Sequence, residues 1–194
     1  RSTGGALGHR IALGAAGLAL GASAALACPQ GMETFLRCTL EGGGKRVEVC
    51  FDRSRVTYAF GRPGRAPELT LSESVATVDY EPWSGVGRAK SEAVRFVNGG
   101  YGYQVIGIMD IDYSPGGDGE IVTTERGYLQ VFRAGADGRI DFIDGTPIAE
   151  MSCDEEATFF PWGGLDGRLW LDEAKQELGL CWSHKIDIGW EACR

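Results

Sequence analysis

The stretch from Phe35 to Ile108 constrains the fold more than any other part of the sequence, because its apolar and polar residues alternate. Within it, Val47, Val49 and Phe51 fall on one side of an extended chain, and the residues between them fall on the other. Successive side chains of a β-strand point to opposite faces of a sheet, so strict alternation is typical of a half-buried strand. The same period recurs further along at Val56, Tyr58, Phe60, Leu69, Leu71, Val94, Phe96, Tyr101, Tyr103 and Val105.

Turn residues separate these alternating runs. Gly42-Gly43-Gly44 precedes the first run, Arg62-Pro63-Gly64 follows Phe60, and Asn98-Gly99-Gly100 stands before Tyr101. Asn-Gly between alternating runs is the strongest short hairpin signal, since both central positions of a type I′ turn need a positive φ. The sequence therefore predicts a mainly β fold: a single antiparallel β barrel or sandwich with a short C-terminal helix, stabilised by disulfides.

We expect three further strands, at Tyr128–Arg133, Ile140–Ile143 and Ile148–Cys153, so that residues 28–153 form the antiparallel β domain. Residues 154–194 then form a tryptophan-rich extension packed on that domain. In the extension, Trp170, Leu171, Ala174 and Leu178 make one apolar stripe at helical spacing, and Gly179 is a suitable end for a short helix.

Residues 1–27 have the three parts of an export signal. Arg10 supplies positive charge, residues 11–27 form an uncharged apolar run, and Ala25-Leu26-Ala27 has the small-x-small form of a cleavage site. A membrane span needs about 20 apolar residues. The run is short for one, and no second such run follows. We therefore expect a periplasmic or secreted protein without a transmembrane span in its mature chain.

Two forms of processing compete at Cys28. Cleavage after Ala27 leaves Cys28 as the first residue, while Leu26-Ala27-Cys28 is also similar to the end of a lipoprotein signal, which would place a lipid anchor on Cys28. The even number of cysteines favours ordinary cleavage and three disulfides, although six cysteines allow 15 pairings. Cys38 is a candidate partner for Cys153, and we expect the last two cysteines to hold the tail. The candidate disulfide cysteines are Cys28, Cys38, Cys50, Cys153, Cys181 and Cys193.

The formal net charge of −8 argues against a nucleic-acid partner, because acidic surfaces repel phosphate backbones. The same charge suits a basic envelope or secreted protein, or it simply serves solubility.

Four carboxylates lie among glycines between Asp110 and Glu120, which raises the question of a calcium site. An EF-hand loop has glycine at its sixth position and glutamate at its twelfth. Counted from Asp110, those positions hold Pro115 and Ile121. We therefore expect a solvated hairpin loop, with calcium as the alternative and no other cofactor. A candidate binding surface consists of Trp83, Asp110, Asp112, Asp118 and Glu120.

Residue types for the common kinds of catalysis are scarce. His184 stands beside Ser183, where the two side chains point apart, and no Gly-x-Ser-x-Gly sequence is present. One histidine in the expected mature chain and no Cys-x-x-Cys pair make a zinc enzyme a poor fit. Glu155 and Glu156 are adjacent, so on a strand they would face opposite sides of a sheet. We predict no catalytic, cofactor-binding or metal-binding residue.

Several short motifs resemble those of small secreted bacterial β proteins of uncharacterised function. They are Phe35-x-x-Cys38, Pro67-Glu68-Leu69, Pro82-Trp83-x-Gly85-x-Gly87-Arg88 and Asn98-Gly99-x-Tyr101. An acidic exported β domain with early and late cysteines is also similar, more weakly, to the periplasmic inhibitors of c-type lysozyme, whose members are antiparallel barrels that plug the lysozyme cleft. Their Ser-Ala-Ser-Gly loop is not matched by Ser72-Glu73-Ser74-Val75, so the resemblance assigns no inhibitory residue.

The expected function is therefore that of a non-enzymatic binding protein of the cell envelope. One version is a proteinaceous inhibitor of a basic hydrolase such as lysozyme. The alternative is a glycan-binding module that uses exposed tryptophans, either Trp83 or those of the tail. A carboxylate-dependent hydrolase is the third and weakest hypothesis.

Overall fold

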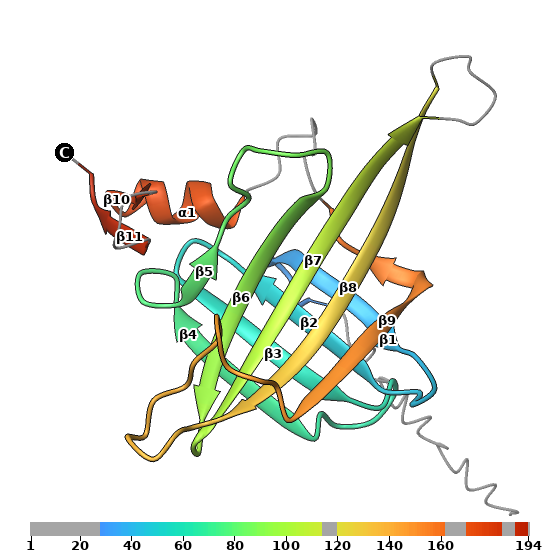
Figure 1. Ribbon diagram of the computed structural model, residues 1–194, viewed down its shortest axis with the longest axis horizontal. Coiled ribbons are helices and arrows are strands. Elements are labelled where there is room, and N and C mark those ends of the chain that lie inside the picture. Colours follow the sequence, from blue (N-terminus) through green and yellow to red (C-terminus); the bar gives the residue numbers. More distant parts are fainter. Residues whose placement is uncertain (1–27, 114–119, 162–169, 184–188, 194) are drawn as a thin grey trace, which may run out of the picture.

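The computed structural model of the protein describes residues 28–113, 120–161, 170–183 and 189–193. These residues form one antiparallel sheet of nine strands, one short helix and a separate pair of strands (Figure 1). The large sheet contains β1 (Glu33–Leu40), β2 (Arg46–Phe51), β3 (Arg55–Gly61), β4 (Leu69–Ser74), β5 (Asp79–Glu81), β6 (Lys90–Asn98), β7 (Tyr101–Tyr113), β8 (Ile121–Arg133) and β9 (Ala149–Phe159); the rest are α1 (Leu171–Glu177), β10 (Leu180–Ser183) and β11 (Gly189–Ala192).

The nine strands follow the order β4-β3-β2-β1-β9-β8-β7-β6-β5, so sheet neighbours are also chain neighbours except where β1 meets β9. That pairing joins two meanders into one curled sheet, and β2 and β3 cross behind β6, β7 and β8 (Figure 1). In the described part of the chain β4 and β5 are the two unpaired edges, so the sheet is a half-barrel that does not close. The predicted mainly β, antiparallel fold class is confirmed.

The apolar residues of the predicted alternation face the core, which fills the inside of the curl. The prediction that β2 is half-buried is wrong, because Glu48 and Cys50 on its other face are also only 3% exposed. Val47 and Val49 of β2 are fully buried, and Val49 lies opposite Tyr58 of β3. The Tyr58 ring reaches the other half of the sheet, where its centroid lies 5.5 Å from that of Phe96 and 5.7 Å from that of Tyr103. Burial of these rings against each other helps to hold the two meanders together.

The Asn98-Gly99-Gly100 turn is also confirmed. Gly99 and Gly100 have φ values of 57° and 80° and connect β6 to β7, with Asn98 opposite Tyr101. Two positive φ angles in a two-residue loop define the turn whose twist matches paired strands.

The β7–β8 hairpin is longer than the sequence predicts. Its pairing runs from Tyr101 opposite Arg133 to Tyr113 opposite Ile121, and its far end extends beyond the other strands (Figure 1). Gly107 and Gly127 lie opposite each other in the middle of the hairpin. Phe160, which follows β9, packs where a Gly107 side chain would lie, so this glycine makes room for the end of β9.

The predicted strand at Ile140–Ile143 is wrong, because these residues lie in the connection between β8 and β9. The Asp141 carboxylate accepts hydrogen bonds from the backbone N–H groups of Ile143 and Asp144, at 3.0 and 2.9 Å. An aspartate that bonds its own following backbone forms a turn instead of a strand. Phe142 packs against Phe132, with ring centroids 5.3 Å apart, so the connection covers the outer face of the sheet.

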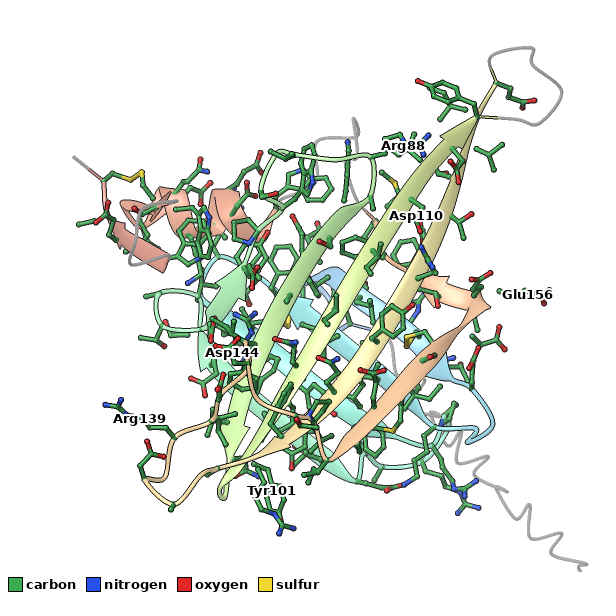
Figure 2. The ribbon with its side chains drawn as sticks, in the orientation of Figure 1. Arg88, Tyr101, Asp110, Arg139, Asp144 and Glu156 are labelled. Carbon is green, nitrogen blue, oxygen red and sulfur yellow. A yellow bond between two sulfur atoms is a disulfide. The ribbon has the colours of Figure 1, made fainter. Side chains whose placement is uncertain are left out.

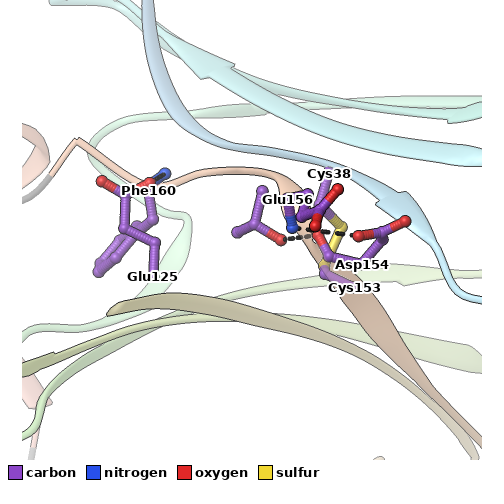
Figure 3. Close-up of a disulfide and its surroundings, with 7 residues drawn as sticks. Cys38, Glu125, Cys153, Asp154, Glu156 and Phe160 are labelled. Carbon is purple, nitrogen blue, oxygen red and sulfur yellow. Dashed lines mark hydrogen bonds between the residues drawn. A yellow bond between two sulfur atoms is a disulfide. The ribbon is translucent and has the colours of Figure 1, made fainter. Parts of the chain in front are cut away.

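Three disulfides are present, as predicted, and the described residues include no free cysteine. Cys38–Cys153 joins β1 to β9 at the pairing that unites the two meanders, and Cys181–Cys193 holds the tail. Figure 3 shows the Cys38–Cys153 disulfide beside a bulge in β9. In this bulge the Glu156 backbone N–H donates to the Asp154 carboxylate at 3.1 Å. Cys28 pairs with Cys50. A thioether lipid anchor on Cys28 and this disulfide exclude each other, because both use the same sulfur.

The helical stripe is partly confirmed. Leu171 and Ala174 are buried under α1, and Gly179 follows the helix with a φ of 76°. The prediction that Leu178 belongs to the buried stripe is wrong, because α1 ends at Glu177 and Leu178 is 50% exposed. In the described ranges, no helix has both the length and the apolar character needed to span a membrane.

Candidate functional site: a cleft at the β5 edge

A cleft of about 610 Å³ separates the β5 edge of the sheet from the C-terminal unit, which consists of α1, β10 and β11. Pockets of about 300–1,000 Å³ are the usual size for small-ligand sites. The residues that give this cleft its chemistry are Asp79, Glu81, Arg95, Lys175, Trp182 and Trp190.

Arg95 forms the charged centre of the cleft. It lies on β6, directly opposite Asp79 of β5, and its guanidinium binds the carboxylates of both Asp79 and Glu81. Its side chain is 11% exposed, whereas those of Asp79 and Glu81 are 56% and 50% exposed. One nearly covered cation therefore fixes two carboxylates that still face solvent.

A row of hydrogen bonds across the outer face of the sheet holds Arg95 in place. The Arg95 Nε donates to Gln104 on β7, whose amide nitrogen donates to Gln130 on β8 at 2.8 Å. The Gln130 amide in turn donates to Glu150 on β9. Each residue lies directly opposite the next in the strand register, so the sheet itself sets the position of the guanidinium.

Lys175 of α1 closes the inner wall of the cleft and is only 1% exposed. Its ammonium donates to the Val78 carbonyl at 2.9 Å and lies 5.2 Å from the centre of the Trp190 ring. Burial lowers the pKa of Lys175 to about 8, although the nearby Asp79 carboxylate raises it. This site therefore holds a cation that gives up its proton far more readily than an exposed lysine.

The two tail tryptophans of the cleft have different roles. Trp190 stacks on Tyr80, with centroids 5.9 Å apart and planes 18° apart, and its indole N–H donates to the Tyr80 carbonyl at 2.7 Å. Trp190 therefore fastens the C-terminal unit to β5. Trp182, directly opposite on β10, meets Trp190 edge-on at 5.6 Å and is partly exposed in the cleft.

The binding surface predicted from the sequence lies elsewhere, at the far end of β7. Figure 2 shows Arg88 and Asp110 near that end, and Arg88 pairs with Asp112 at 3.5 Å. Asp110 pairs with Arg126 of β8, so both aspartates face arginines, which opposes a calcium site there. The indole of Trp83 donates to the Val86 carbonyl at 3.2 Å, with Lys90 over its ring.

The other residues considered from the sequence are not among the described residues that line the cleft. Glu120 is exposed just before β8, whereas Asp118, Trp162 and His184 lie outside the described residues. Glu155 and Glu156 are exposed on the β9 bulge and do not meet in a cleft.

The tail tryptophans of the cleft were expected from the sequence as a possible sugar platform, but the charged residues that form the cleft were not. Lys175 carried a signal, since it stands four residues after Leu171 and one after Ala174, on the buried stripe of α1. Asp79, Glu81 and Arg95 carried none, because only the pairing of β5 with β6 brings them together.

Comparisons of the chain with protein-family models, with curated proteins and with solved structures found no match.

Proposed function

We propose that the protein is a non-enzymatic binding protein of an extracytoplasmic compartment, and that it holds a saccharide in the cleft at the β5 edge. The observation that carries the proposal is the pair of half-exposed carboxylates, Asp79 and Glu81, fixed by Arg95 beside the partly exposed indole of Trp182.

This set of groups suits a sugar ring. Carboxylates accept hydrogen bonds from hydroxyl groups, and the guanidinium that fixes them is a donor. An indole presents an apolar body against which the C–H face of a pyranose packs. The volume of about 610 Å³ accommodates a short saccharide, and the strand register sets the geometry before the ligand arrives.

Binding without hydrolysis is part of the proposal. A glycosidase needs one carboxyl group that delivers a proton and another that acts as base or nucleophile. In this cleft both Asp79 and Glu81 bind the same guanidinium, so the two carboxylates share one electrostatic environment instead of two contrasting ones. Three disulfides support a location outside the reducing cytosol.

Calorimetric titration with peptidoglycan fragments, chito-oligosaccharides and other common oligosaccharides tests the proposal. We expect one of these classes to bind, and Trp182→Ala and Asp79→Asn each to weaken binding at least tenfold, about 1.4 kcal/mol. Trp83→Ala is the matched control, since the Lys90 ammonium lies over that indole and Trp83 is not among the residues that line the cleft. If no saccharide binds at millimolar concentration, or if Trp182→Ala binds as well as the wild type, the cleft is not a sugar site.

A second candidate function is inhibition of a basic hydrolase, and the β7–β8 hairpin favours it. At its far end Tyr113, Ile121 and Val122 are 61%, 60% and 45% exposed, and the acidic Asp110 and Asp112 precede them. A projecting apolar end on an acidic protein suits insertion into the cleft of a basic enzyme, where charge complementarity speeds association.

Titration of lysozyme activity at low and high salt tests this second candidate. We expect inhibition that weakens with added salt and is lost in Tyr113→Ser/Ile121→Ser. Unchanged hydrolysis at micromolar protein would remove inhibition of lysozyme from consideration.

A further inference from the structure

Glu48 is the most deeply buried carboxylate that the cleft does not use. It lies in the middle of β2 and is 3% exposed. Its Oε1 atom has no hydrogen-bond partner among the described residues. Burial raises the pKa of Glu48, and the charges of Arg37 and Arg46 oppose that rise. Arg37 stands opposite Glu48 on β1, but its guanidinium lies over the Phe159 ring, 5.2 Å from the centroid.

The Cys28–Cys50 disulfide lies beside this carboxyl group. Glu48 and Cys50 are two residues apart on β2 and share one face of the strand. One carboxylate oxygen of Glu48 and the two sulfurs all lie within 4.8 Å of one another, and this is the one such group of three potential metal ligands in the described ranges. A buried, unpartnered acceptor carries a free-energy cost that a suitable partner would remove.

We propose that opening the Cys28–Cys50 disulfide creates a binding site for a thiophilic divalent cation such as Zn²⁺, with Cys28, Cys50 and Glu48 as its three protein ligands. This site is separate from the saccharide cleft and does not depend on the function proposed for it.

The step balances with a dithiol as the reductant. The dithiol gives up two electrons and two protons and becomes a disulfide, the Cys28–Cys50 bond breaks, and each sulfur becomes a thiol. Cation binding then releases the two thiol protons, and the proton of Glu48 where it is present, to solvent. Two thiolates and one carboxylate around a divalent cation have a net charge of −1, which the neighbouring Arg37 and Arg46 complement.

The geometry needs only a small adjustment. Two zinc–sulfur bonds of about 2.3 Å at a tetrahedral angle place the sulfurs about 3.8 Å apart, so the two bonded sulfurs must separate. The carboxylate oxygen of Glu48 already lies within 4.8 Å of both. Cys28 lies before β1 in a non-strand segment, with its sulfur 3.2 Å from the Thr34 hydroxyl, whereas Cys50 and Glu48 are fixed in β2. We therefore expect the Cys28 end to move. A water molecule would complete a four-coordinate site.

Cobalt(II), a spectroscopic substitute for zinc, tests the proposal on protein reduced with a phosphine under anaerobic conditions. We expect thiolate-to-cobalt charge-transfer absorption at one equivalent, displaced by Zn²⁺, and at least tenfold weaker binding in Glu48→Gln. Glu73→Gln, which changes a partly exposed carboxylate on β4, is the matched control. Cys28→Ser/Cys50→Ser should abolish binding.

Alkylation with iodoacetamide, mapped by mass spectrometry, shows which cysteines the metal protects. If full reduction unfolds the protein by circular dichroism, partial reduction of a Cys181→Ser/Cys193→Ser background avoids the problem. That background lacks the exposed tail disulfide, and we expect the Cys38–Cys153 bridge to be reduced last, because both of its cysteines are buried whereas Cys28 is partly exposed. Joint protection of Cys28 and Cys50 by Zn²⁺ supports the proposal. It is overturned if these two are not protected, if Glu48→Gln keeps wild-type affinity, or if the double serine variant still binds the metal.

Discussion

Removal of the Cys38–Cys153 disulfide should destabilise the protein more than removal of either other bridge. A disulfide restricts the unfolded chain, and in the chain-entropy treatment its effect grows with the length of the loop that it closes. The loop here is 115 residues long, which corresponds to about 4.8 kcal/mol at 25 °C. The loops of 22 and 12 residues correspond to about 3.4 and 2.8 kcal/mol.

The position of this bridge adds to its effect. Cys38 and Cys153 are 0% and 4% exposed, so replacing them by alanine also removes buried contacts. They lie where β1 pairs with β9, the one strand pairing in the described sheet that does not join chain neighbours. A typical domain is stable by about 5–15 kcal/mol, so a loss near 5 kcal/mol is a large part of the total.

Urea denaturation of the oxidised protein measures this loss. The comparison is between Cys38→Ala/Cys153→Ala and the matched Cys181→Ala/Cys193→Ala, each against the wild type. We expect the first pair to reduce the free energy of unfolding by about 2 kcal/mol more than the second, the difference between the two loop-length estimates. An equal or larger loss in the tail variant would refute the claim that the long loop controls stability. The m-values must also be compared, because residual structure in the unfolded state would change them.

Three further predictions concern single positions. Gly107→Ala should cost about 1–3 kcal/mol in denaturation experiments, because its Cβ would overlap the buried Phe160 ring. Gly102→Ala should cost less, because its Cβ would meet the partly exposed side chains of Ile140 and Phe142. Lys175→Met should remove a pH dependence of stability. Folding lowers the pKa of Lys175 from 10.5 to about 8, so between about pH 8 and 10.5 the unfolded chain binds the proton more tightly and the free energy of unfolding of the wild type rises with pH. We expect urea denaturation of the variant to show no such rise. Glu48→Gln should gain stability relative to the wild type as the pH rises above 4.5. The pKa of Glu48 is raised on folding, so the wild type loses free energy of unfolding as its carboxyl group ionises, whereas glutamine does not titrate. If the difference in free energy of unfolding between variant and wild type is the same at pH 4 and pH 8, this prediction is wrong.

Much of the scaffold could be predicted from the sequence because its signals are local. The alternation of Val47, Val49 and Phe51 needs only the period of a strand, and the turn at Gly99 and Gly100 needs only their freedom to adopt positive φ. Leu171 and Ala174 marked the buried side of α1 for the same kind of reason. Cys38 was a candidate partner for Cys153 because the two were expected on an early and a late strand, and the structure joins them.

The errors have local causes as well. Ile140–Ile143 has a strand-like composition, but the Asp141 carboxylate bonds the backbone that a strand would need. Leu178 fits the helical period, but the helix ends at Glu177, so this side chain faces solvent.

Amino-acid order by itself determined most strands of the large sheet, the turn at Gly99 and Gly100 and the even set of cysteines, but it did not indicate β5, β10 or β11. Only the tertiary structure decided that the sheet stays open between β4 and β5, and that Arg95 fixes Asp79 and Glu81 in a cleft beside Trp182. It also decided that the carboxyl group of Glu48, whose Oε1 has no hydrogen-bond partner among the described residues, lies beside Cys28 and Cys50. The physical reason is that strand period and turn geometry act between neighbours in the chain, whereas charge pairing and burial depend on which distant strands meet.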